Sequence, residues 1–481
     1  MRTTVCRARI LEQISGQVWG WWLMALFVGV GLLFTFRLRG IQIRRLGTAL
    51  RSIFRKEKEG DGVSSYAALC TALAATIGTG NIVGVATALA AGGPGALFWM
   101  LVSAVFGMAT QYAEAFLAVK YRRKQGDGWL GGPFYYIERG LGKRWRWLAV
   151  TFAVIGAAVG ILGVGTVTQV NSITSAVQNF FDAEQKRISF SFGGRTFSWS
   201  SVISGALVTV CAALVLLGGV KRISGVCEML VPLMSVIYVG CCLILLFRFA
   251  DRIPQAVCLI VQSAFHPKAV LGASAGVTLK MALRMGIGRG VFTNEAGLGT
   301  TPIAAASARS GDPVRQGLTA MSGTFIDTIV ICTMTGLCLV VTDAWKITGL
   351  EGVQITDHAW RMALPFSQSL SSFLLMLCLV FFAFATIIGW NFYAERCLEY
   401  LTGGDSRAVR LYRVLYLLAV AVGPYLTVSA AWEMADILNA VMALPNLTAL
   451  LLLQGDVVRG TRDYFQRLRT DKDATTKKYK F

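Results

Sequence analysis

Residues 76–81 (Thr-Ile-Gly-Thr-Gly-Asn) form the segment of this sequence with the clearest potential to bind a ligand. Glycines alternate there with hydroxyl and amide side chains, which is a poor composition for a continuous helix. If the helix unwinds, free backbone N–H groups suit a carboxylate and free carbonyls suit a small hard cation. The alternative is a tight helix crossing in which Asn81 forms an interhelical hydrogen bond.

A second segment of this kind is residues 272–276 (Gly-Ala-Ser-Ala-Gly), in another apolar stretch. Irregular backbone at membrane depth is tolerated only where it lines a site or is buried in protein. Interrupted helices in corresponding positions of two inverted halves point to a transport site between them. The alternative is that these glycines serve helix packing alone.

The composition requires that membrane helices position these segments. Of 481 residues, 55% are hydrophobic and 15% are charged, whereas soluble domains have roughly 45–50% and 25%. The 51 glycines against 10 prolines fit closely packed membrane helices and exclude a disordered, fibrous or disulfide-rich secreted chain. The net charge of +20 falls between long apolar runs, so it indicates membrane orientation and not nucleic-acid binding.

Eleven stretches are apolar and long enough to cross a bilayer, which needs about 20 residues of helix. They are residues 17–36, 65–91, 94–119, 147–181, 200–218, 225–248, 270–289, 317–343, 367–393, 408–428 and 429–453. If the first runs from outside to inside, 35 of the 46 Lys and Arg residues lie on the inner side, with 280–315 counted as an inner segment. The positive-inside rule then predicts an outside N-terminus and a cytoplasmic C-terminus.

Without the first helix, ten remain, and a shift of five helices inverts the topology. This count is compatible with two inverted repeats, residues 61–250 and 251–455. They lie between an N-terminal part (1–60) and a basic cytoplasmic tail (456–481). Arginines alternate with apolar residues in 41–54, which predicts a helix at the cytoplasmic membrane surface, with a solvated charge run as the alternative.

Several long motifs, in order along nearly the whole chain, resemble the alanine or glycine:cation symporters, also called sodium:alanine symporters. These motifs are residues 72–88, 111–122, 131–136, 289–302, 382–390 and 436–447. The resemblance implies an all-α polytopic protein with a LeuT-like core of two inverted five-helix repeats, broken in its first and sixth helices. It also implies import of alanine or glycine with sodium across the cytoplasmic (inner) membrane. It implies no enzyme activity, no cofactor besides the transported ion, no nucleic acid and no obligate protein partner.

The resemblance assigns roles to individual residues. Thr79 and Gly80 are expected to hold the substrate carboxylate. Gln169 is expected to face the substrate, with an interhelical hydrogen bond as the alternative. Trp390, one turn beyond Thr386, is expected to limit the size of the substrate, with a position at the membrane interface as the alternative. In the second break, Ser274 and Gly276 are expected to face the same substrate.

The same resemblance places sodium on the backbone carbonyls of Ala74 and Ile77 and on the Thr386 hydroxyl, with Asn81 as a further candidate ligand. Many family members carry serine where this chain has Ala385, so one hydroxyl ligand is missing. This departure keeps proton coupling open as an alternative.

Acidic residues inside apolar spans are candidates for ion coupling. Asp327 lies among threonines and is expected to be held by their hydroxyls, whereas Glu114 is expected to be solvated at the cytoplasmic end. Glu295, in a segment expected to be cytoplasmic, either pairs with Arg289 or is solvated. The rival functions are a proton-coupled transporter that uses Asp327 or Glu114, a channel, and a membrane-embedded enzyme. The two histidines lie in connecting segments without a catalytic motif, which argues against the enzyme.

Overall fold

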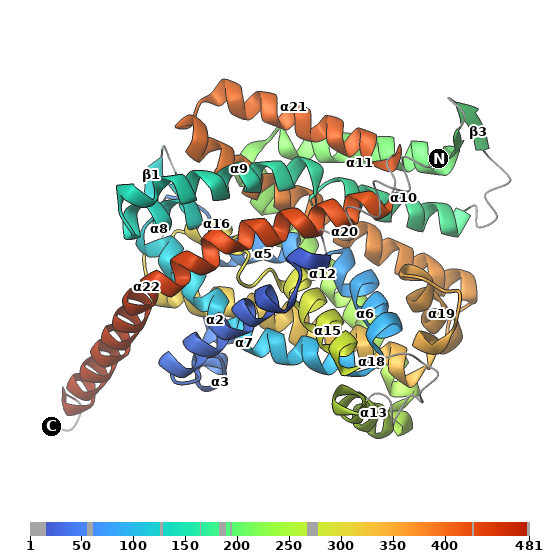
Figure 1. The fold of residues 1–481 in the computed structure, drawn as a ribbon, viewed down its shortest axis with the longest axis horizontal. Coiled ribbons are helices and arrows are strands. Elements are labelled where there is room, and N and C mark those ends of the chain that lie inside the picture. Colours follow the sequence, from blue (N-terminus) through green and yellow to red (C-terminus); the bar gives the residue numbers. More distant parts are fainter. Residues whose placement is uncertain are drawn as a thin grey trace.

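The computed structural model describes residues 16–54, 61–125, 128–163, 165–181, 189–192, 195–266, 278–425 and 428–478. Helices make up nearly all of it, with two short hairpins, β1–β2 and β3–β4 (Figure 1). The elements of the first half are α2 (Trp21–Arg37), α3 (Ile41–Arg44), α4 (Leu46–Ile53), α5 (Ser65–Thr76), η1 (Gly80–Gly84), α6 (Val85–Gly92), α7 (Gly95–Lys120), β1 (Arg123–Gln125), β2 (Gly128–Leu130), α8 (Pro133–Gly140), η2 (Lys143–Trp145), α9 (Arg146–Leu162), α10 (Val167–Phe181), β3 (Ser189–Phe192), β4 (Arg195–Ser198), α11 (Trp199–Leu216) and α12 (Gly219–Arg248).

The second half begins after α12. Its elements are η3 (Ala250–Arg252), α13 (Ile253–Phe265), α15 (Leu279–Asn294), α16 (Thr301–Ala306), α17 (Pro313–Thr324), η5 (Phe325–Cys332), α18 (Thr333–Val341), η6 (Ala344–Lys346), α19 (Val353–Ala363), α20 (Gln368–Thr402), α21 (Ser406–Val422), η7 (Gly423–Tyr425) and α22 (Val428–Lys478). Of these, η5 is π-helical, as is η1 in the first half.

Within the described residues, eight helices are long and apolar enough to span a membrane, and a ninth span results if α5 and α6 are counted together. These nine coincide with nine of the eleven predicted stretches. Of the other two stretches, 17–36 contains α2, which has only 17 residues, and 270–289 falls partly outside the described residues. The helical fold is thus confirmed, while the count of eleven stays a prediction.

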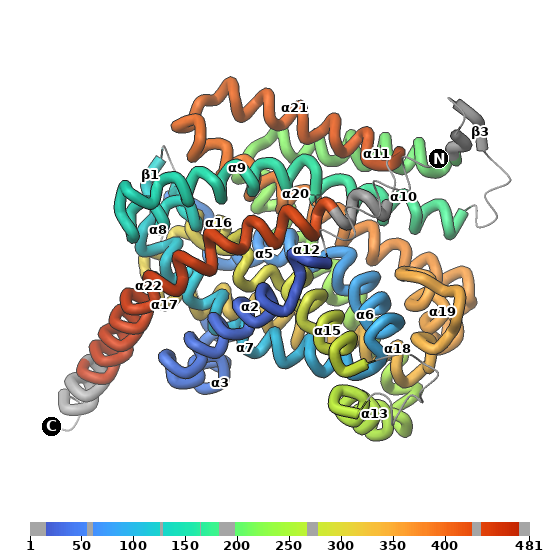
Figure 2. Tube along the Cα trace, in the orientation of Figure 1, coloured from blue at the N-terminus to red at the C-terminus, as the bar shows by residue number. Residues whose placement is uncertain are grey.

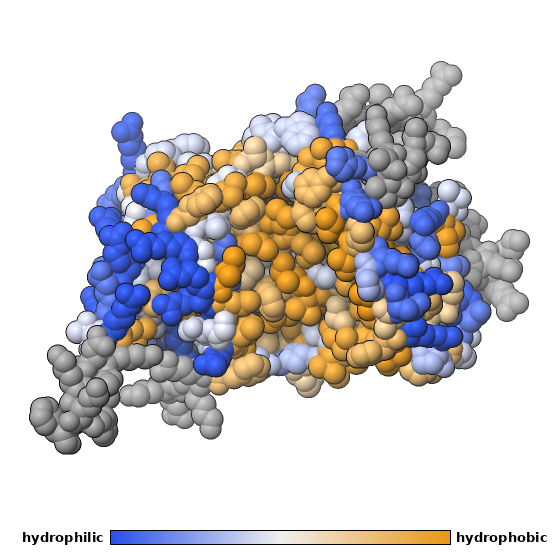
Figure 3. Space-filling model, turned by 90° about the horizontal axis from the view of Figure 1, so that it is seen from below, coloured by the Kyte–Doolittle hydropathy of each residue, from blue (hydrophilic) through white to orange (hydrophobic). Residues whose placement is uncertain are grey.

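The outer surface carries the apolar side chains that a lipid environment requires. Ile203 and Leu207 of α11, Val236 of α12 and Leu411 of α21 are each more than half exposed. Figure 3 shows an apolar band across one face of the molecule, between hydrophilic surfaces at the two ends. This arrangement is typical of a protein that spans a bilayer.

The segment 280–315 differs from its prediction as a single cytoplasmic stretch. It runs parallel to α7: Gly286 lies against Ala96, and further along Thr301 donates to Gln111 at 3.0 Å. At the far end, Ala306 contacts Gly131, beyond the end of α7. Lys280 and Arg284 therefore lie at the opposite end of α7 from Arg309 and Arg315. The excess of Lys and Arg residues on the predicted inner side is therefore smaller than the sequence count, but it remains.

Candidate functional site

The first predicted helix break is present. Helix α5 is capped by Ser64, whose side chain accepts the N–H of Ala67 at 3.0 Å, and it ends at Thr76. The chain then bends by 52° before the helix resumes as α6. Gly78 donates its N–H to Asn81 Oδ1 at 2.9 Å and not to the Ala74 carbonyl, its partner in a continuous helix. The break therefore leaves backbone groups available in a buried position.

Gly78 is the point at which three elements converge. A Cβ atom built on Gly78 would lie 2.5 Å from Thr386 Oγ1 of α20 and 3.7 Å from Gln169 Oε1 of α10. The structure thus brings together Gln169, which the sequence analysis expects to face the substrate, and Thr386, which it expects to bind sodium. Only a glycine leaves this space open.

Two buried oxygens at the break have no hydrogen-bond partner in the described part of the chain, namely Thr79 Oγ1 and Gln169 Oε1. The exposed fractions of these two residues are 0% and 1%. Buried polar atoms are nearly always satisfied, by protein, water or a ligand. Unpaired oxygens at a helix break therefore indicate a place for a polar ligand.

Trp390 lies one turn beyond Thr386 on α20 and is 1% exposed. It packs against Gly165, where a built Cβ would lie 2.5 Å from Trp390 Cβ, and its ring meets Tyr393 edge-on at 5.8 Å. Gly165 lies between the end of α9 at Leu162 and the start of α10 at Val167, within the predicted stretch 147–181. The tryptophan is thus part of the core, near the start of the helix that carries Gln169.

Gly80 faces the end of α15. A Cβ on Gly80 would lie 2.9 Å from Thr293 Cγ2 and 3.4 Å from Phe292 Cδ1. These two side chains therefore cover Gly80, which the sequence analysis expects to hold the substrate carboxylate. Sequence reasoning missed Phe292 and Thr293, although both lie inside one of the motifs that it used.

A second break lies between α15 and α16. Glu295, Gly297 and Gly299 adopt positive φ values of 56°, 93° and 83°, and Glu295 is only 2% exposed. The expectation of a cytoplasmic, solvated Glu295 is wrong, because the segment lies along α7 in the core. Glu295 Oε2 accepts the Thr300 hydroxyl at 2.5 Å. The predicted break at 272–276, with Ser274 and Gly276, lies outside the described residues.

Two further acids lie inside the protein. Glu114 is fully buried, so its predicted solvation is wrong; its Oε1 accepts the Gly299 N–H at 3.1 Å and Asn446 Nδ2 at 2.5 Å. Asp327 is held by a hydroxyl, as predicted, since Thr328 donates to its Oδ2 at 2.7 Å. Asn81 Nδ2 donates to the other oxygen of Asp327 at 2.7 Å.

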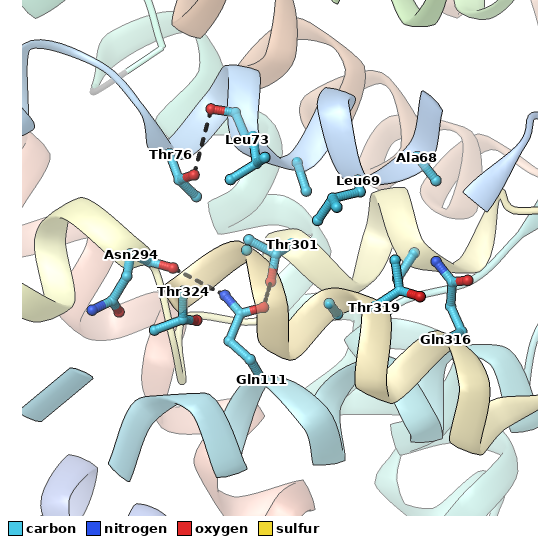
Figure 4. A pocket seen from close by; sticks show the side chains of 14 residues that line it. Ala68, Leu69, Leu73, Thr76, Gln111, Asn294, Thr301, Gln316, Thr319 and Thr324 are labelled. Carbon is cyan, nitrogen blue, oxygen red and sulfur yellow. Dashed lines mark hydrogen bonds between the residues drawn. The ribbon is translucent and has the colours of Figure 1, made fainter. Parts of the chain in front are cut away.

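A small cavity of about 20 Å³ lies along one side of α5. Figure 4 shows Thr76, at the end of α5, on its upper side, and Gln111 opposite, between Asn294 and Thr301. Gln111 donates to the Asn294 carbonyl at 2.9 Å and accepts from Thr301. The cavity thus joins the first break, at Thr76, to the second break, at Asn294.

Broken helices around buried, unpaired polar groups are typical of multi-pass membrane transporters. Comparison with solved structures agrees: the fold is similar to the crystal structure of MhsT in complex with L-phenylalanine. The TM-score is 0.58, the sequence identity is 14%, and the match covers 84% of this chain and 93% of that one.

Sequence comparison then identifies the family. The model of the sodium:alanine symporter family matches residues 4–478. An uncharacterized transporter of Haemophilus influenzae is 48% identical over 462 residues, covering 96% of each chain. The sodium/alanine symporter AgcS of Methanococcus maripaludis is 41% identical over 465 residues, covering 95% of this chain and 96% of that one. The chain belongs to the sodium:alanine symporter family; it is a sodium-coupled amino-acid symporter and not an enzyme.

Proposed function

We propose that this protein imports alanine or glycine with sodium, and that the amino acid binds at the break between α5 and α6. The observation that supports this site best is the convergence of Thr386 and Gln169 on Gly78, beside the unpaired oxygens of Thr79 and Gln169. The N–H groups of Thr79 and Gly80 would hold the substrate carboxylate, and the Gln169 amide would bind a second polar group.

Trp390 would form the wall that limits the substrate side chain. Its buried position against Gly165, one turn from Thr386, supports this role. Phe292 and Thr293, which cover Gly80, would close the site from the side of α15. This is the part that the sequence analysis gave to Ser274 and Gly276.

The sodium ion would bind to the carbonyls of Ala74 and Ile77 and to Thr386 Oγ1. The Ala74 carbonyl is free of its helical partner because the Gly78 N–H donates to Asn81 instead. The Thr386 hydroxyl donates to the Phe382 carbonyl at 3.0 Å, so its oxygen lone pairs remain available toward Gly78. Asn81 is a weaker candidate ligand, since its Oδ1 already accepts from Gly78.

Transport would proceed by alternating access within eleven helices, with inverted repeats at 61–250 and 251–455, an outside N-terminus and a cytoplasmic tail. The cavity beside α5 supports a release route, because its lining extends from Thr76 to Gln316. Gln316 lies near the start of α17 and accepts from Ser65, the first residue of α5, at 2.9 Å. Opening this side would require α5 to move away from α17.

The test is uptake of radiolabelled alanine and glycine into proteoliposomes with imposed sodium or proton gradients. We expect accumulation with an inward sodium gradient and none with a proton gradient alone. Sodium-independent uptake, or transport of neither amino acid, would contradict the proposal.

Proton coupling is the second candidate, and Asp327 favours it. This carboxyl is fully buried, and its recorded partners are Asn81 and Thr328, neither of which carries a charge. A buried carboxyl without a cation nearby is a natural proton site. Proton-driven uptake that disappears in Asp327→Asn would establish this mechanism.

A further inference from the structure

A basic hollow of about 450 Å³ lies where α2 and α3 meet the distal half of α22. Six arginines line it: Arg37, Arg39, Arg44, Arg45, Arg462 and Arg469. Among them lie the apolar side chains of Leu38, Ile41, Val458 and Phe465. None of the described residues in the lining is acidic. The transport site does not use any of these residues.

No acidic residue in the described part of the chain neutralises the arginine charges of this hollow. Arg37 donates to the neutral Gln454 at 2.7 Å, and the Arg45 guanidinium stacks over Phe465 at 4.3 Å. Across the described ranges, no ion pair joins any of the six arginines to an acid. By contrast, the neighbouring Arg459 pairs with Asp456 at 2.9 Å. Such a concentration of one charge attracts an anion.

The hollow lies at the boundary between apolar and polar surface. The apolar helix α2 ends at Arg37, and a turn with positive φ at Arg39 and Gly40 leads into α3. Two large apolar side chains beside it face outward, Phe36 with 76% and Ile43 with 73% of its surface exposed. Figure 2 shows α22 leaving the bundle beside α2 and α3. A ligand here can therefore contact guanidinium groups and lipid-facing apolar surface at once.

We propose that this hollow binds the phosphate groups of an anionic phospholipid, whose acyl chains lie along Phe36 and Ile43. The planar guanidinium fork matches phosphate oxygens in bidentate geometry. Basic pockets beside membrane helices bind phospholipid headgroups for this reason. The adjoining apolar surface favours a lipid over free phosphate, which shares the headgroup chemistry but has no chains to bury.

The test uses the full-length protein in phosphatidylcholine nanodiscs that contain cardiolipin, with bound lipid counted by native mass spectrometry. The pocket variant combines Arg44→Gln, Arg462→Gln and Arg469→Gln. The control combines Arg144→Gln, Arg407→Gln and Arg410→Gln, which removes the same charge from exposed arginines outside the hollow. Because each arginine near a membrane contributes severalfold to anionic-lipid affinity, we expect the pocket variant to bind cardiolipin about 10- to 100-fold more weakly. The control should stay within about twofold of wild type, as surface charges outside a site have little effect.

Equal loss in both variants would overturn the proposal, since it would show attraction by net charge alone. A competition arm with inorganic phosphate separates the two sources of the anion. Phosphate that displaces cardiolipin at equal concentration would assign the hollow to a soluble anion and also overturn the proposal. If the pocket variant still takes up alanine with sodium, it is folded, and its weaker cardiolipin binding then reflects the hollow and not a loss of fold.

Discussion

Replacing Gly78 by alanine should weaken sodium activation of transport. The new Cβ would lie 2.5 Å from Thr386 Oγ1, whereas real Cβ atoms essentially never approach another heavy atom within 3.0 Å, so the two groups must separate by at least 0.5 Å. Overpacking of this kind costs about 1–3 kcal/mol. If the displaced oxygen is a sodium ligand, the sodium concentration for half-maximal uptake should rise by about 5- to 150-fold. The measurement is initial alanine uptake into proteoliposomes at increasing external sodium.

Gly84→Ala is the matched control. Gly84 ends the π-helical turn η1 with φ −63°, and a Cβ on it meets nothing within 4 Å. Both changes add one methyl group and restrict the unfolded chain equally. We expect Gly84→Ala to leave the sodium dependence unchanged, and melting curves in detergent check that both variants fold. If the two variants give the same sodium dependence, Gly78 does not touch the ion site, and the placement of Thr386 beside it is irrelevant to coupling.

Three further predictions address the same site. Thr386→Ala should raise the half-saturating sodium concentration at least about tenfold, while the affinity for alanine at saturating sodium changes less. Ala385→Ser should lower the half-saturating sodium concentration, because it supplies a hydroxyl. Unchanged sodium curves for both variants would show that this part of α20 does not belong to the ion site. Gln169→Leu should weaken alanine binding by about 1–3 kcal/mol, the cost of leaving a buried partner unpaired, as measured by competition against labelled substrate; an unaltered affinity would assign Gln169 to helix packing. Trp390→Ala should improve competition by larger amino acids in a series from glycine to leucine, and a uniform loss across the series would exclude it from the pocket wall.

The first break was predictable because its signal is local. Glycines beside hydroxyl and amide side chains interrupt an apolar run at residues 76–81, and no tertiary information is needed to read this. The convergence of Gln169 and Thr386 on Gly78 was not predictable from spacing, because three helices far apart in sequence create it. Only the family resemblance placed these residues together.

The course of residues 280–315 differs from its prediction for a physical reason. Lys280, Arg284 and Arg289 lie in helix α15, and the sequence analysis counts them together with Arg309 and Arg315 as one inner segment. The structure instead packs α15 along α7, where Gly286 and Gly290 allow close contact with Ala96 and Ser103. Such helix contacts depend on small residues in both partners and leave little trace in a hydropathy profile.

Glu114 illustrates the same limit. Its position near Lys120 suggests a solvated carboxylate, but its hydrogen-bond donors are the N–H of Gly299 and the amide of Asn446, which lie 185 and 332 residues away. Burial of a charged group depends on partners from the whole fold. A single sequence shows the acid without showing what satisfies it.

The two breaks are joined by a buried chain of hydrogen bonds, and this connection gives coupling a structural basis. Asn81 accepts from Gly78 at the first break and donates to Asp327 in η5. Thr328, next to Asp327, accepts from Asn294 at 3.2 Å, where the second break begins. In a low-dielectric interior each of these bonds is costly to leave unmade. A ligand that reorders Gly78 therefore changes the partners available to Asn81 and, through Asp327 and Thr328, to Asn294.

The two π-helical turns η1 and η5 lie on this hydrogen-bonded path, and π-helical turns occur mostly at functional sites. The connection predicts that Asn81→Ala changes the sodium dependence of alanine binding as well as the affinity itself, since it removes the link between the breaks without touching Thr386 or Gln169.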